Sequence, residues 1–301
     1  MSALTVEPDS LSESLHAWAL PQLGARVAAV RLTASYREVL SHQPYPAQLA
    51  GWLGEGLAAS ALLMAGLKFE GRLSLQFQSP NALRLLYAEC SSEGDLRGIA
   101  RWQEGHAFSA DFRAELAGGL LVLTLESARQ RERHQGIVPL EGDNLAECLA
   151  AYFQQSEQLE TLVLLAADGQ QCAGLLAQRL PSEGGHATAV DPDGWNRIGH
   201  LLATVGPQEL CSSAPDTLLE RLFHDETRLL REPTSLRLRC RCSRDKVSEV
   251  LRQIGREEAL AAAESGQAAI TCEFCGRVYR FDRVEIEQLF HLAGPASPRL
   301  Q

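Results

Sequence analysis

The sequence predicts an α+β (mixed α/β) N-terminal core domain, a helical linker and a small C-terminal domain. Three observations lead to this prediction. Strand candidates are interspersed with helix candidates over the first part of the chain, the composition changes at Pro181, and four of the eight cysteines fall in two close pairs near the C-terminus. We place the core domain at 1–184, the linker at 185–236 and the C-terminal domain at 237–301.

The composition indicates a chain that folds around a sizeable core. It has 301 residues, of which 45% are hydrophobic, so wholesale disorder is excluded. The formal net charge is −10. An acidic chain argues against a broad nucleic-acid footprint, which needs a basic patch or stripe.

Several short segments of the core domain have the pattern of β-strands. Segment 72–78 is the clearest, because Leu73, Leu75 and Phe77 alternate with polar residues and would share one face. Turn-forming residues separate neighbouring candidates, as at 168–169. The predicted strands are 26–32, 72–78, 83–90, 96–100, 120–125, and a hairpin of 162–165 with 173–180.

The most apolar stretch, 49–67, has the length of a membrane span. Glu55 lies inside it, however, and an acidic side chain at mid-membrane costs about 2.5–3.5 kcal/mol. Four glycines also weaken it as a free-standing helix. We therefore predict a buried core helix that begins near Pro46, and no association with a membrane.

Apolar residues also recur at helical spacing on both sides of a connection rich in Pro, Gly and Ser at 181–194. The helices of the linker are short and amphipathic, so we expect them to dock on another part of the molecule. The predicted helices are one capped by Asp143 or Asn144 that runs through Phe153, one over 195–204, and one from Asp216 or Thr217 through Phe223.

The C-terminal domain has its own helix and hairpin signals. A serine can cap its first helix, and a glycine can end it. The expected elements are a helix from Ser243 to Gly255, a short helix at 257–264, a hairpin of 269–271 with 278–281, and a last helix at 284–292.

The spacing of the last four cysteines is the strongest functional signal. Cys240 and Cys242 form a C-x-C pair. After 29 intervening residues, Cys272 and Cys275 form a C-x-x-C pair. Two close pairs at this separation are typical of a tetrahedral zinc site. We predict that the four thiolates bind one zinc ion, with the C-x-C pair on an extended strand whose alternate residues share a face. The C-terminal domain is thus predicted to be zinc-binding.

Other ionisable residues are interpreted as structural. His291 is the nearest rival ligand, but four cysteines complete the tetrahedron, and His134 has no paired nucleophile. The charged run at 126–133 is expected to be a solvated loop. Four arginines flank the cysteine pairs and would offset the thiolate charge: Arg239, Arg241, Arg244 and Arg277. The remaining cysteines are expected to be buried, inert thiols: Cys90, Cys148, Cys172 and Cys211.

The sequence contains none of the motifs GxxxxGK[ST], GxGxxG or GxSxG, so we predict no catalytic residue and no enzymatic activity. Residues 1–14 lack the charged-then-apolar pattern of a signal peptide. A reducing cytoplasm is therefore the expected location, with the paired cysteines held as thiols or on a metal.

The size of the C-terminal domain makes a metal important for its stability. Its elements between 237 and 292 hold fewer than 60 residues, a size at which a hydrophobic core alone is marginal. A structural zinc contributes about 10–16 kcal/mol. Disulfides within each pair would close loops of three or four residues and contribute only about 1.5–2 kcal/mol each. Oxidation that displaces the metal is thus expected to unfold this domain, and the helical segments between 195 and 230 are candidates for what is released.

Motifs along nearly the whole chain resemble one known family. They include LKFEGRLSLQFQ (67–78), RHQGIVPLEGDNLAECL (133–149), LLERLFHDE (218–226), CRCSRDKV (240–247) and ITCEFCGRVYRFD (270–282). These segments resemble the bacterial 33-kDa chaperonin family, the redox-regulated heat-shock chaperones that hold unfolding proteins without ATP. The four predicted ligand positions agree with the family pattern.

The resemblance implies a redox cycle. The reduced protein would be a zinc-bound, inactive monomer. Oxidants would convert Cys272 and Cys275, then Cys240 and Cys242, into two disulfides, and zinc would be released. The C-terminal domain and linker would then unfold, homodimers would form, and unfolded or partially unfolded client proteins would bind. Reduction would reverse these changes.

Two other functions stay open at this point. A zinc-ribbon protein that binds nucleic acid is one, although residues 237–301 carry only 11 Arg and Lys against 9 Asp and Glu. A thiol oxidoreductase is the other, and it predicts turnover on a disulfide substrate that depends on Cys272. Its C-x-x-C motif would normally open a helix after a strand, whereas here we expect a hairpin.

Overall fold

The computed structural model describes residues 13–67, 69–129, 133–180, 191–264 and 266–291. The chain divides into two compact units, Met1–Arg239 and Cys240–Gln301. Both units contain helices and strands, which confirms the predicted α+β class. Three sequence expectations fall outside the described residues: those for 1–12, for Arg131 and Glu132, and for most of the connection, 181–190.

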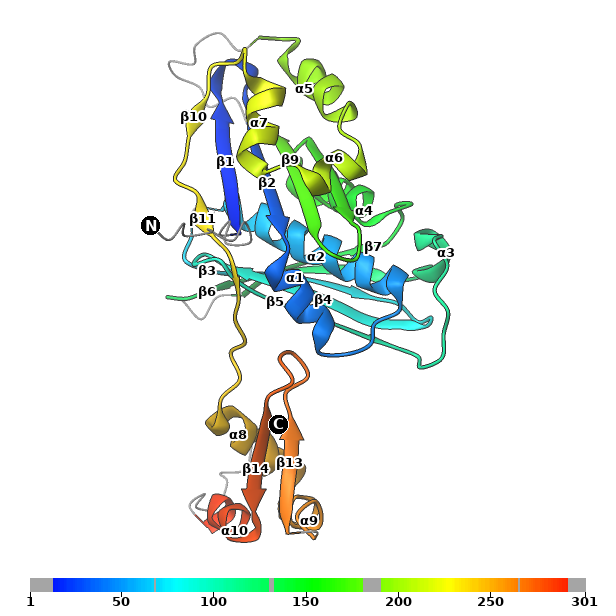
Figure 1. Ribbon diagram of the computed structural model, residues 1–301, viewed down its shortest axis with the longest axis vertical. Coiled ribbons are helices and arrows are strands. Elements are labelled where there is room, and N and C mark those ends of the chain that lie inside the picture. Colours follow the sequence, from blue (N-terminus) through cyan, green and yellow to red (C-terminus); the bar gives the residue numbers. More distant parts are fainter. Residues whose placement is uncertain (1–12, 68, 130–132, 181–190, 265, 292–301) are drawn as a thin grey trace, which may run out of the picture. The chain divides into compact units, whose positions relative to one another are not determined.

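The first unit is built around two six-stranded sheets (Figure 1). Sheet A has the strand order β10-β1-β2-β9-β8, and β11 also pairs with β1. All of its pairs are antiparallel. Its strands are β1 (Ser14–Leu20), β2 (Ala25–Leu32), β8 (Thr161–Ala167), β9 (Cys172–Arg179), β10 (Leu229–Leu230) and β11 (Thr234–Ser235).

Sheet B has the order β12-β5-β4-β3-β6-β7, and only its β12–β5 pair is parallel. The alternation predicted for 72–78 is confirmed, because Leu73, Leu75 and Phe77 are buried and the residues between them are partly exposed. The strands of sheet B are β3 (Gly71–Gln78), β4 (Leu83–Ser91), β5 (Asp95–Trp102), β6 (Leu120–Ser127), β7 (Arg133–Pro139) and β12 (Arg237–Leu238).

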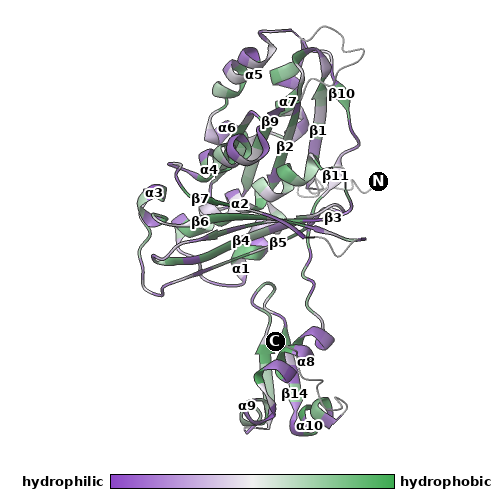
Figure 2. Cartoon of the chain, turned by 180° about the vertical axis from the view of Figure 1, so that it is seen from behind, coloured by the Kyte–Doolittle hydropathy of each residue, from purple (hydrophilic) through white to green (hydrophobic). Residues whose placement is uncertain are grey.

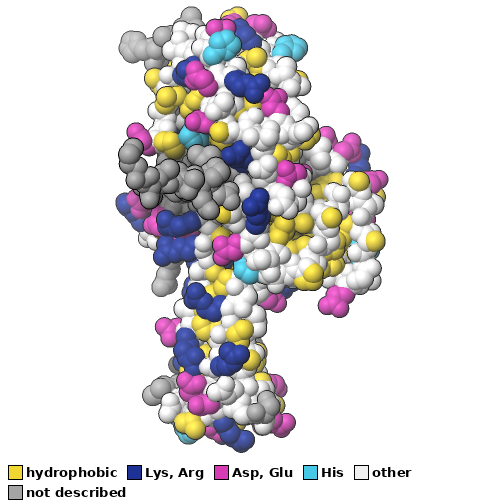
Figure 3. Space-filling view, in the orientation of Figure 1, with side chains coloured by type: hydrophobic (Ala, Val, Ile, Leu, Met, Phe, Trp, Pro, Cys, Tyr) yellow, Lys and Arg dark blue, Asp and Glu magenta, His cyan; other side chains and the backbone are white. Residues whose placement is uncertain are grey.

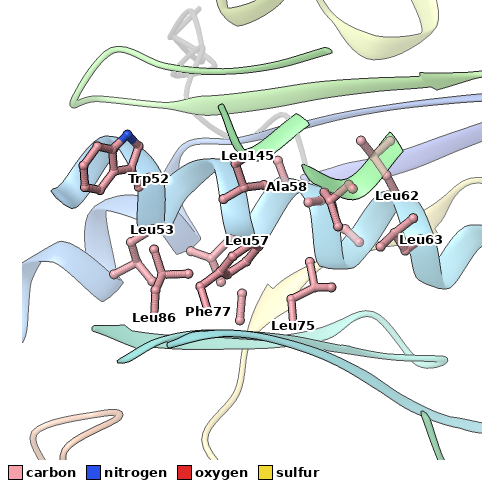
Figure 4. Close-up of a cluster of buried hydrophobic side chains, with 14 of the residues drawn as sticks. Trp52, Leu53, Leu57, Ala58, Leu62, Leu63, Leu75, Phe77, Leu86 and Leu145 are labelled. Atoms are coloured by element: carbon pink, nitrogen blue, oxygen red, sulfur yellow. The ribbon is translucent and has the colours of Figure 1, made fainter. Parts of the chain in front are cut away.

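Helix α2 (Ala47–Ala65) lies between the two sheets and buries side chains on all of its sides. Figure 4 shows Leu53 and Leu57 of this helix pointing toward Phe77 of sheet B, while Leu145 of helix α4 lies on the opposite side of α2. The prediction of a buried core helix is thus confirmed. None of the described helices combines the length and the hydropathy that a membrane span requires.

Close packing around α2 leaves no space for a side chain at Gly54. A Cβ atom at Gly54 would lie 2.7 Å from Cε2 of Tyr36 and 2.9 Å from Cβ of Cys172. Tyr36 belongs to helix α1 (Ala34–Ser41), and its hydroxyl donates a hydrogen bond of 2.9 Å to the carbonyl oxygen of Ala50. The glycine that weakens an isolated helix therefore lets the folded core close around α2.

Three helices, which we call the outer helices, cover the face of sheet A that points away from α2. They are α5 (Gly194–Ala203), α6 (Pro207–Ser212) and α7 (Pro215–Phe223). Along β2, Ala28 packs in the cluster around α2, whereas Val27 packs with the outer helices. In Figure 2, α5 and α6 show both hydrophobic and hydrophilic stretches, as expected for helices with one buried face. The docking expected for the short helices of the linker is therefore observed.

Two predicted boundaries in the first unit are wrong. Helix α7 begins at Pro215, before Asp216 or Thr217, because proline suits the first helical turn and the acidic residue then lies within that turn. The charged run at 126–133 is not all loop. Glu126 belongs to β6 and Arg133 to β7, because pairing between these strands extends to this residue pair.

The remaining elements of the first unit are short. The side chain of Asn144 caps α4 (Leu145–Tyr152), as one of the two predicted alternatives, by accepting a hydrogen bond from the backbone N–H of Glu147. The chain then continues into a π-helix. Elements absent from the sequence prediction are β1, β7, α1, α6, α3 (Phe112–Glu115), the 3₁₀ turn η1 (Pro21–Leu23), the π-helix η2 (Phe153–Glu157) and the two-residue strands β10, β11 and β12.

The second unit is a hairpin covered by helices. Ser243 caps its first helix by accepting a hydrogen bond from the N–H of Lys246, and Gly255, with φ of 100°, ends that helix. Its elements are α8 (Arg244–Ile254), α9 (Arg256–Ala261), β13 (Gln267–Thr271), β14 (Val278–Asp282) and α10 (Arg283–His291). Its core is Val247, Leu251, Ala259, Ala263, Ala268, Tyr279, Phe281 and Ile286.

Candidate metal centre

The C-x-x-C pair lies in the turn of the hairpin, as predicted. Cys272 directly follows β13, and its carbonyl oxygen accepts hydrogen bonds from the N–H groups of Cys275, at 3.3 Å, and Gly276, at 2.8 Å. The N–H of Cys272 donates to the carbonyl oxygen of Arg277 at 2.9 Å. Gly276 has φ of 64°, a left-handed conformation that glycine adopts readily. This tight turn directs both sulfurs to the same side.

The C-x-C pair is not on a β-strand, contrary to the prediction. Strand β12 ends at Leu238, and Cys240 and Cys242 follow in a segment without regular secondary structure. A β-strand needs a neighbouring strand to pair with, and none of the described strands pairs with this segment. Instead, the cap of α8 at Ser243 fixes the chain immediately after the second cysteine.

The four sulfurs nevertheless converge. All of them lie within 4.8 Å of one another, and the Sγ–Sγ distance is 3.6 Å for Cys240–Cys272 and 3.4 Å for Cys242–Cys275. A tetrahedral zinc with Zn–S bonds of about 2.3 Å separates its sulfurs by about 3.8 Å. The cluster therefore has the size and the donor set for one such ion. Within the described part of the chain, no other group of three or more His, Cys, Asp or Glu side chains has metal-binding geometry.

The sulfurs differ in their electrostatic surroundings. Burial raises the pKa of Cys240 and of Cys275. Burial also opposes ionisation of Cys242, but hydrogen bonds from Tyr279 and from the neighbouring thiols outweigh it and lower the pKa of Cys242 to about 7. One thiolate held by its neighbours is stable without a metal, whereas four adjacent thiolates need a cation.

Two residues outside the cysteine motifs support the centre. The hydroxyl of Tyr279 on β14 donates a hydrogen bond of 3.1 Å to Sγ of Cys242. The pKa of Arg277 is raised by its interaction with Tyr279 and by the nearby Cys242 and Cys275. Tyr279 was not predicted from the sequence, although its place four residues after Cys275, across a short hairpin, is a signal that could have identified it.

Two of the other arginines expected to offset the thiolate charge, Arg239 and Arg244, are paired with carboxylates. Arg244 pairs with Glu285 at 2.6 Å, and its guanidinium lies 4.2 Å from the ring centroid of Phe281. Arg239 pairs with Asp95 of β5 at 3.3 Å. The same carboxylate pairs with Arg237 at 2.7 Å. A carboxylate of sheet B is thus ion-paired to the residue immediately before Cys240, and this link was not predicted from the sequence.

The single cysteines are not part of this cluster, and all four are buried, as predicted. Burial raises the pKa of Cys172 far above its usual range and that of Cys211 to about 11, so both stay protonated at neutral pH. His291 ends α10 and is not part of the cluster, and His134 is exposed on β7.

Comparisons with known proteins agree over most of the chain. The family model described as Hsp33 protein matches residues 13–282. A protein of Nitrosococcus oceani called 33 kDa chaperonin is 43% identical over 279 residues, which covers 92% of this chain and 94% of the relative. A 33 kDa chaperonin of Azotobacter vinelandii is 43% identical over 270 residues, with 89% and 91% covered. The crystal structure of a 33 kDa chaperonin from Thermotoga maritima shares the fold, with a TM-score of 0.77 at 20% identity, and covers 93% of this chain and 98% of that one.

Proposed function

The chain belongs to the Hsp33 family, and from this premise we propose that it is a redox-regulated, ATP-independent chaperone that holds unfolding proteins. The observation that carries the proposal is the cluster of four sulfurs within 4.8 Å, in a unit whose described residues contribute only eight buried hydrophobic side chains to its core. A unit this small needs a bound metal to stay folded. Metal binding in turn needs the thiolate form of the cysteines, which an oxidant converts into disulfides.

The reduced state is proposed to hold one zinc ion on Cys240, Cys242, Cys272 and Cys275. When bound, zinc supplies structural cross-linking and stabilises the thiolates. Oxidation then joins Cys272 to Cys275 and Cys240 to Cys242. Each S–S bond forms when two thiolates lose two electrons in total to an oxidant such as hydrogen peroxide, which takes up two protons from solvent and is reduced to two water molecules. The oxidised sulfurs no longer bind the ion, which is released.

The energies favour unfolding of the second unit after this step. The metal contributes about 10–16 kcal/mol to such a site, whereas each short-loop disulfide contributes about 1.5–2 kcal/mol. Among the described residues of this unit, four large aliphatic side chains are exposed to solvent and add little to its core: Val250, Ile254, Val278 and Val284.

Unfolding can spread into the first unit through the segment that precedes Cys240. This segment, 229–239, holds to the sheets through three two-residue pairings, those of β10 and β11 with β1 and of β12 with β5. The ion pairs of Arg237 and Arg239 with Asp95 add to these contacts. Figure 1 shows the segment, in yellow, running along β1 from α7. This segment follows α7, the last of the outer helices, in the chain. When the segment is released from the sheets, the outer helices therefore lose the support that it gives them at that end.

The surface beneath the outer helices fits the proposed binding of unfolded clients. The face of sheet A that they cover is apolar, and the helices bury apolar side chains against it. Exposed hydrophobic surface of this kind binds unfolding chains and favours self-association, so we propose that the oxidised protein forms homodimers and binds partially unfolded proteins. The sheet contributes Val27, Ala29, Ala173, Leu175 and Ala177, and the helices contribute Ile198, Leu202, Leu218, Leu219 and Phe223.

The cytoplasm is the proposed location, because its reducing conditions would keep the thiols on the metal until oxidant appears. The nucleic-acid-binding alternative gains little from the second unit. Figure 3 shows basic and acidic side chains intermingled on the visible face of this unit. Several of its arginines are paired, as in Arg244–Glu285 at 2.6 Å and Arg256–Glu287 at 2.7 Å, so little positive charge is left for phosphates.

The decisive experiment compares reduced and peroxide-oxidised protein as suppressors of light scattering by a thermally unfolding client enzyme. Zinc, free thiols and far-ultraviolet circular dichroism are measured on the same samples. We expect that oxidation releases one zinc, removes four thiols, lowers helix content and confers the activity, and that reductant reverses all four changes. Equal activity in both states, or zinc and helix retained after full oxidation, contradicts the proposal.

A further inference from the structure

A pocket of about 280 Å³ lies in the first unit, where strands β1, β2 and β9 of sheet A meet the C-terminal end of α2. Leu62, Leu176 and Leu180 give it apolar walls. Two arginines also line it: Arg26 on β2 and Arg231, which directly follows β10. No acidic side chain is among the described residues that line this pocket.

The two guanidinium groups have neutral partners. Arg26 donates from Nη1 to the carbonyl oxygen of Gly66 and from Nη2 to Oε1 of Gln178. Arg231 donates from Nη1 to the carbonyl oxygen of Ala65 at 3.4 Å. Among the described ion pairs, none involves either arginine. Nε of Arg26 is shielded from solvent and has no hydrogen-bond partner in the structure.

Hydrogen bonding to the end of α2 explains where these arginines lie, but it leaves their two positive charges without a full counter-charge. Both donate to carbonyls at the end of α2, and a helix C-terminus carries about half a negative charge. That partial charge compensates less than one of the two guanidinium groups. Burial lowers the pKa of Arg26, and the nearby charge of Arg231 lowers it further, because two cations repel each other. Arg26 is partly buried, whereas Arg231 is exposed to solvent. Partial desolvation makes the charge of Arg26 costly without a counter-charge, so an anion placed between the two guanidinium groups would be stabilised.

We propose that this pocket binds an amphiphilic carboxylate, with its head between Arg26 and Arg231 and its hydrocarbon chain along Leu62 and Leu176. The planar guanidinium group matches a carboxylate through paired hydrogen bonds. The leucine walls favour a hydrocarbon chain over a bare inorganic ion. A volume of about 280 Å³ equals that of about nine water molecules, which suits a chain of about six to eight carbons.

The site would also connect two parts of the first unit. Arg26 belongs to the central part of sheet A, whereas Arg231 belongs to the segment 229–239 that pairs with the edge of that sheet. An anion held by both side chains therefore ties this segment to β2. Ligand binding is expected to slow amide hydrogen exchange in residues 229–235, because exchange there requires the segment to open.

Isothermal titration calorimetry on the reduced, full-length protein tests this site with three probes. Octanoate is expected to bind with 1:1 stoichiometry. Octanamide, which keeps the chain but lacks the charge, and inorganic phosphate, which lacks the chain, are each expected to bind at least about tenfold more weakly. Absence of octanoate binding, or binding of either other probe with the same affinity, overturns the proposal.

Two variants locate the binding. Arg231→Gln is expected to weaken octanoate binding at least about tenfold, whereas Arg84→Gln is expected to leave it unchanged. Arg84 is a matched control, since it also donates to a main-chain carbonyl, that of Pro80, but lies outside the pocket. Leu180→Glu, at a position that is 40% exposed, adds a carboxylate at the pocket and is expected to prevent binding without disturbing the core. Unchanged affinity in both pocket variants contradicts the proposal.

Discussion

The hydroxyl of Tyr279 donates a hydrogen bond of 3.1 Å to the sulfur of Cys242, and this bond joins the second strand of the hairpin to the C-x-C pair. Donation to a sulfur favours its thiolate form, which is the form that binds a metal. Residues that orient and polarise metal ligands affect metal affinity without touching the metal. Tyr279 is therefore the first position at which the proposed centre can be tested without removing a cysteine.

Tyr279→Phe is expected to lower zinc affinity about tenfold or more, because it removes the hydrogen bond and keeps the ring in the core. Competition with a chromogenic chelator measures the affinity. Val278→Ala is the control, since its side chain is 41% exposed and belongs to the neighbouring position on the same strand. Equal zinc affinity in Tyr279→Phe and the unmodified protein would show that the hydroxyl does not support the centre.

Chelation of the metal under reducing conditions is expected to unfold the second unit and leave the first unit folded. The four tryptophans all precede residue 240, so their fluorescence reports on the first unit alone. Circular dichroism should lose the signal of α8, α9 and α10, while tryptophan emission keeps the position typical of the buried Trp18 and Trp52. Added zinc should restore the helices. Full helix content in verified metal-free, reduced protein contradicts this expectation.

Asp95→Asn is expected to loosen the segment 229–239, because it weakens the ion pairs with Arg237 and Arg239. Both arginines are more than half exposed, so the effect on stability is at most about 1 kcal/mol. Hydrogen exchange of the segment should be faster by up to about fivefold. Asp143→Asn, which weakens the exposed pair with Arg113, is the control and should leave exchange there unchanged. Equal exchange in both variants would mean that Asp95 does not hold the segment.

The extent to which the sequence predicted these features depends on how local each one is. The alternation of Leu73, Leu75 and Phe77 lies within one strand and needs no partner to be recognised, and β3 was predicted from it. The two cysteine pairs are recognisable by spacing alone, and the structure brings their sulfurs together. Strands β10, β11 and β12 have two residues each and exist only through their partners, so no periodicity reveals them.

Features that depend on distant residues were missed for the same reason. Strand β1 shows no strict alternation, because the outer helices cover one of its faces and α2 the other. The approach of Asp95 to Arg237 joins residues more than a hundred positions apart, and nothing near either residue signals it. The C-x-C pair was assigned to a strand because alternate residues of a strand share a face, but the turn and the α8 cap bring its sulfurs together without one.

Glu55 is expected to make stability depend on pH. Its carboxyl group lies on α2 between the sheets, and burial raises its pKa from 4.5 to about 7. The carboxyl group of Glu55 loses its proton near pH 4.5 in the unfolded chain and near pH 7 in the folded chain. Its burial therefore lowers the free energy of unfolding by an amount that is absent below pH 4.5 and grows up to pH 7. Glu55→Gln is therefore expected to stabilise the protein at pH 8 by on the order of 3 kcal/mol more than at pH 4.5. Urea unfolding at both pH values measures this, and the exposed Glu38→Gln, expected to show no such difference, is the control.

Phe223→Ala is expected to activate the protein without oxidation. Phe223 ends α7 and is fully buried against sheet A, so its truncation costs about 3–5 kcal/mol and loosens the outer helices. The apolar face of sheet A then opens while the four paired cysteines stay reduced. Suppression of client light scattering by the reduced variant, with thiols counted on the same sample, measures the effect.

Phe77→Ala is the matched control for this prediction. Phe77 is equally large and is 1% exposed, but it lies between sheet B and α2, so its loss destabilises the core without freeing the outer helices. This variant should melt at lower temperature and show no activity when reduced. If both reduced variants suppress scattering equally, general destabilisation explains the activity. If neither does, the surface beneath the outer helices is not where clients bind.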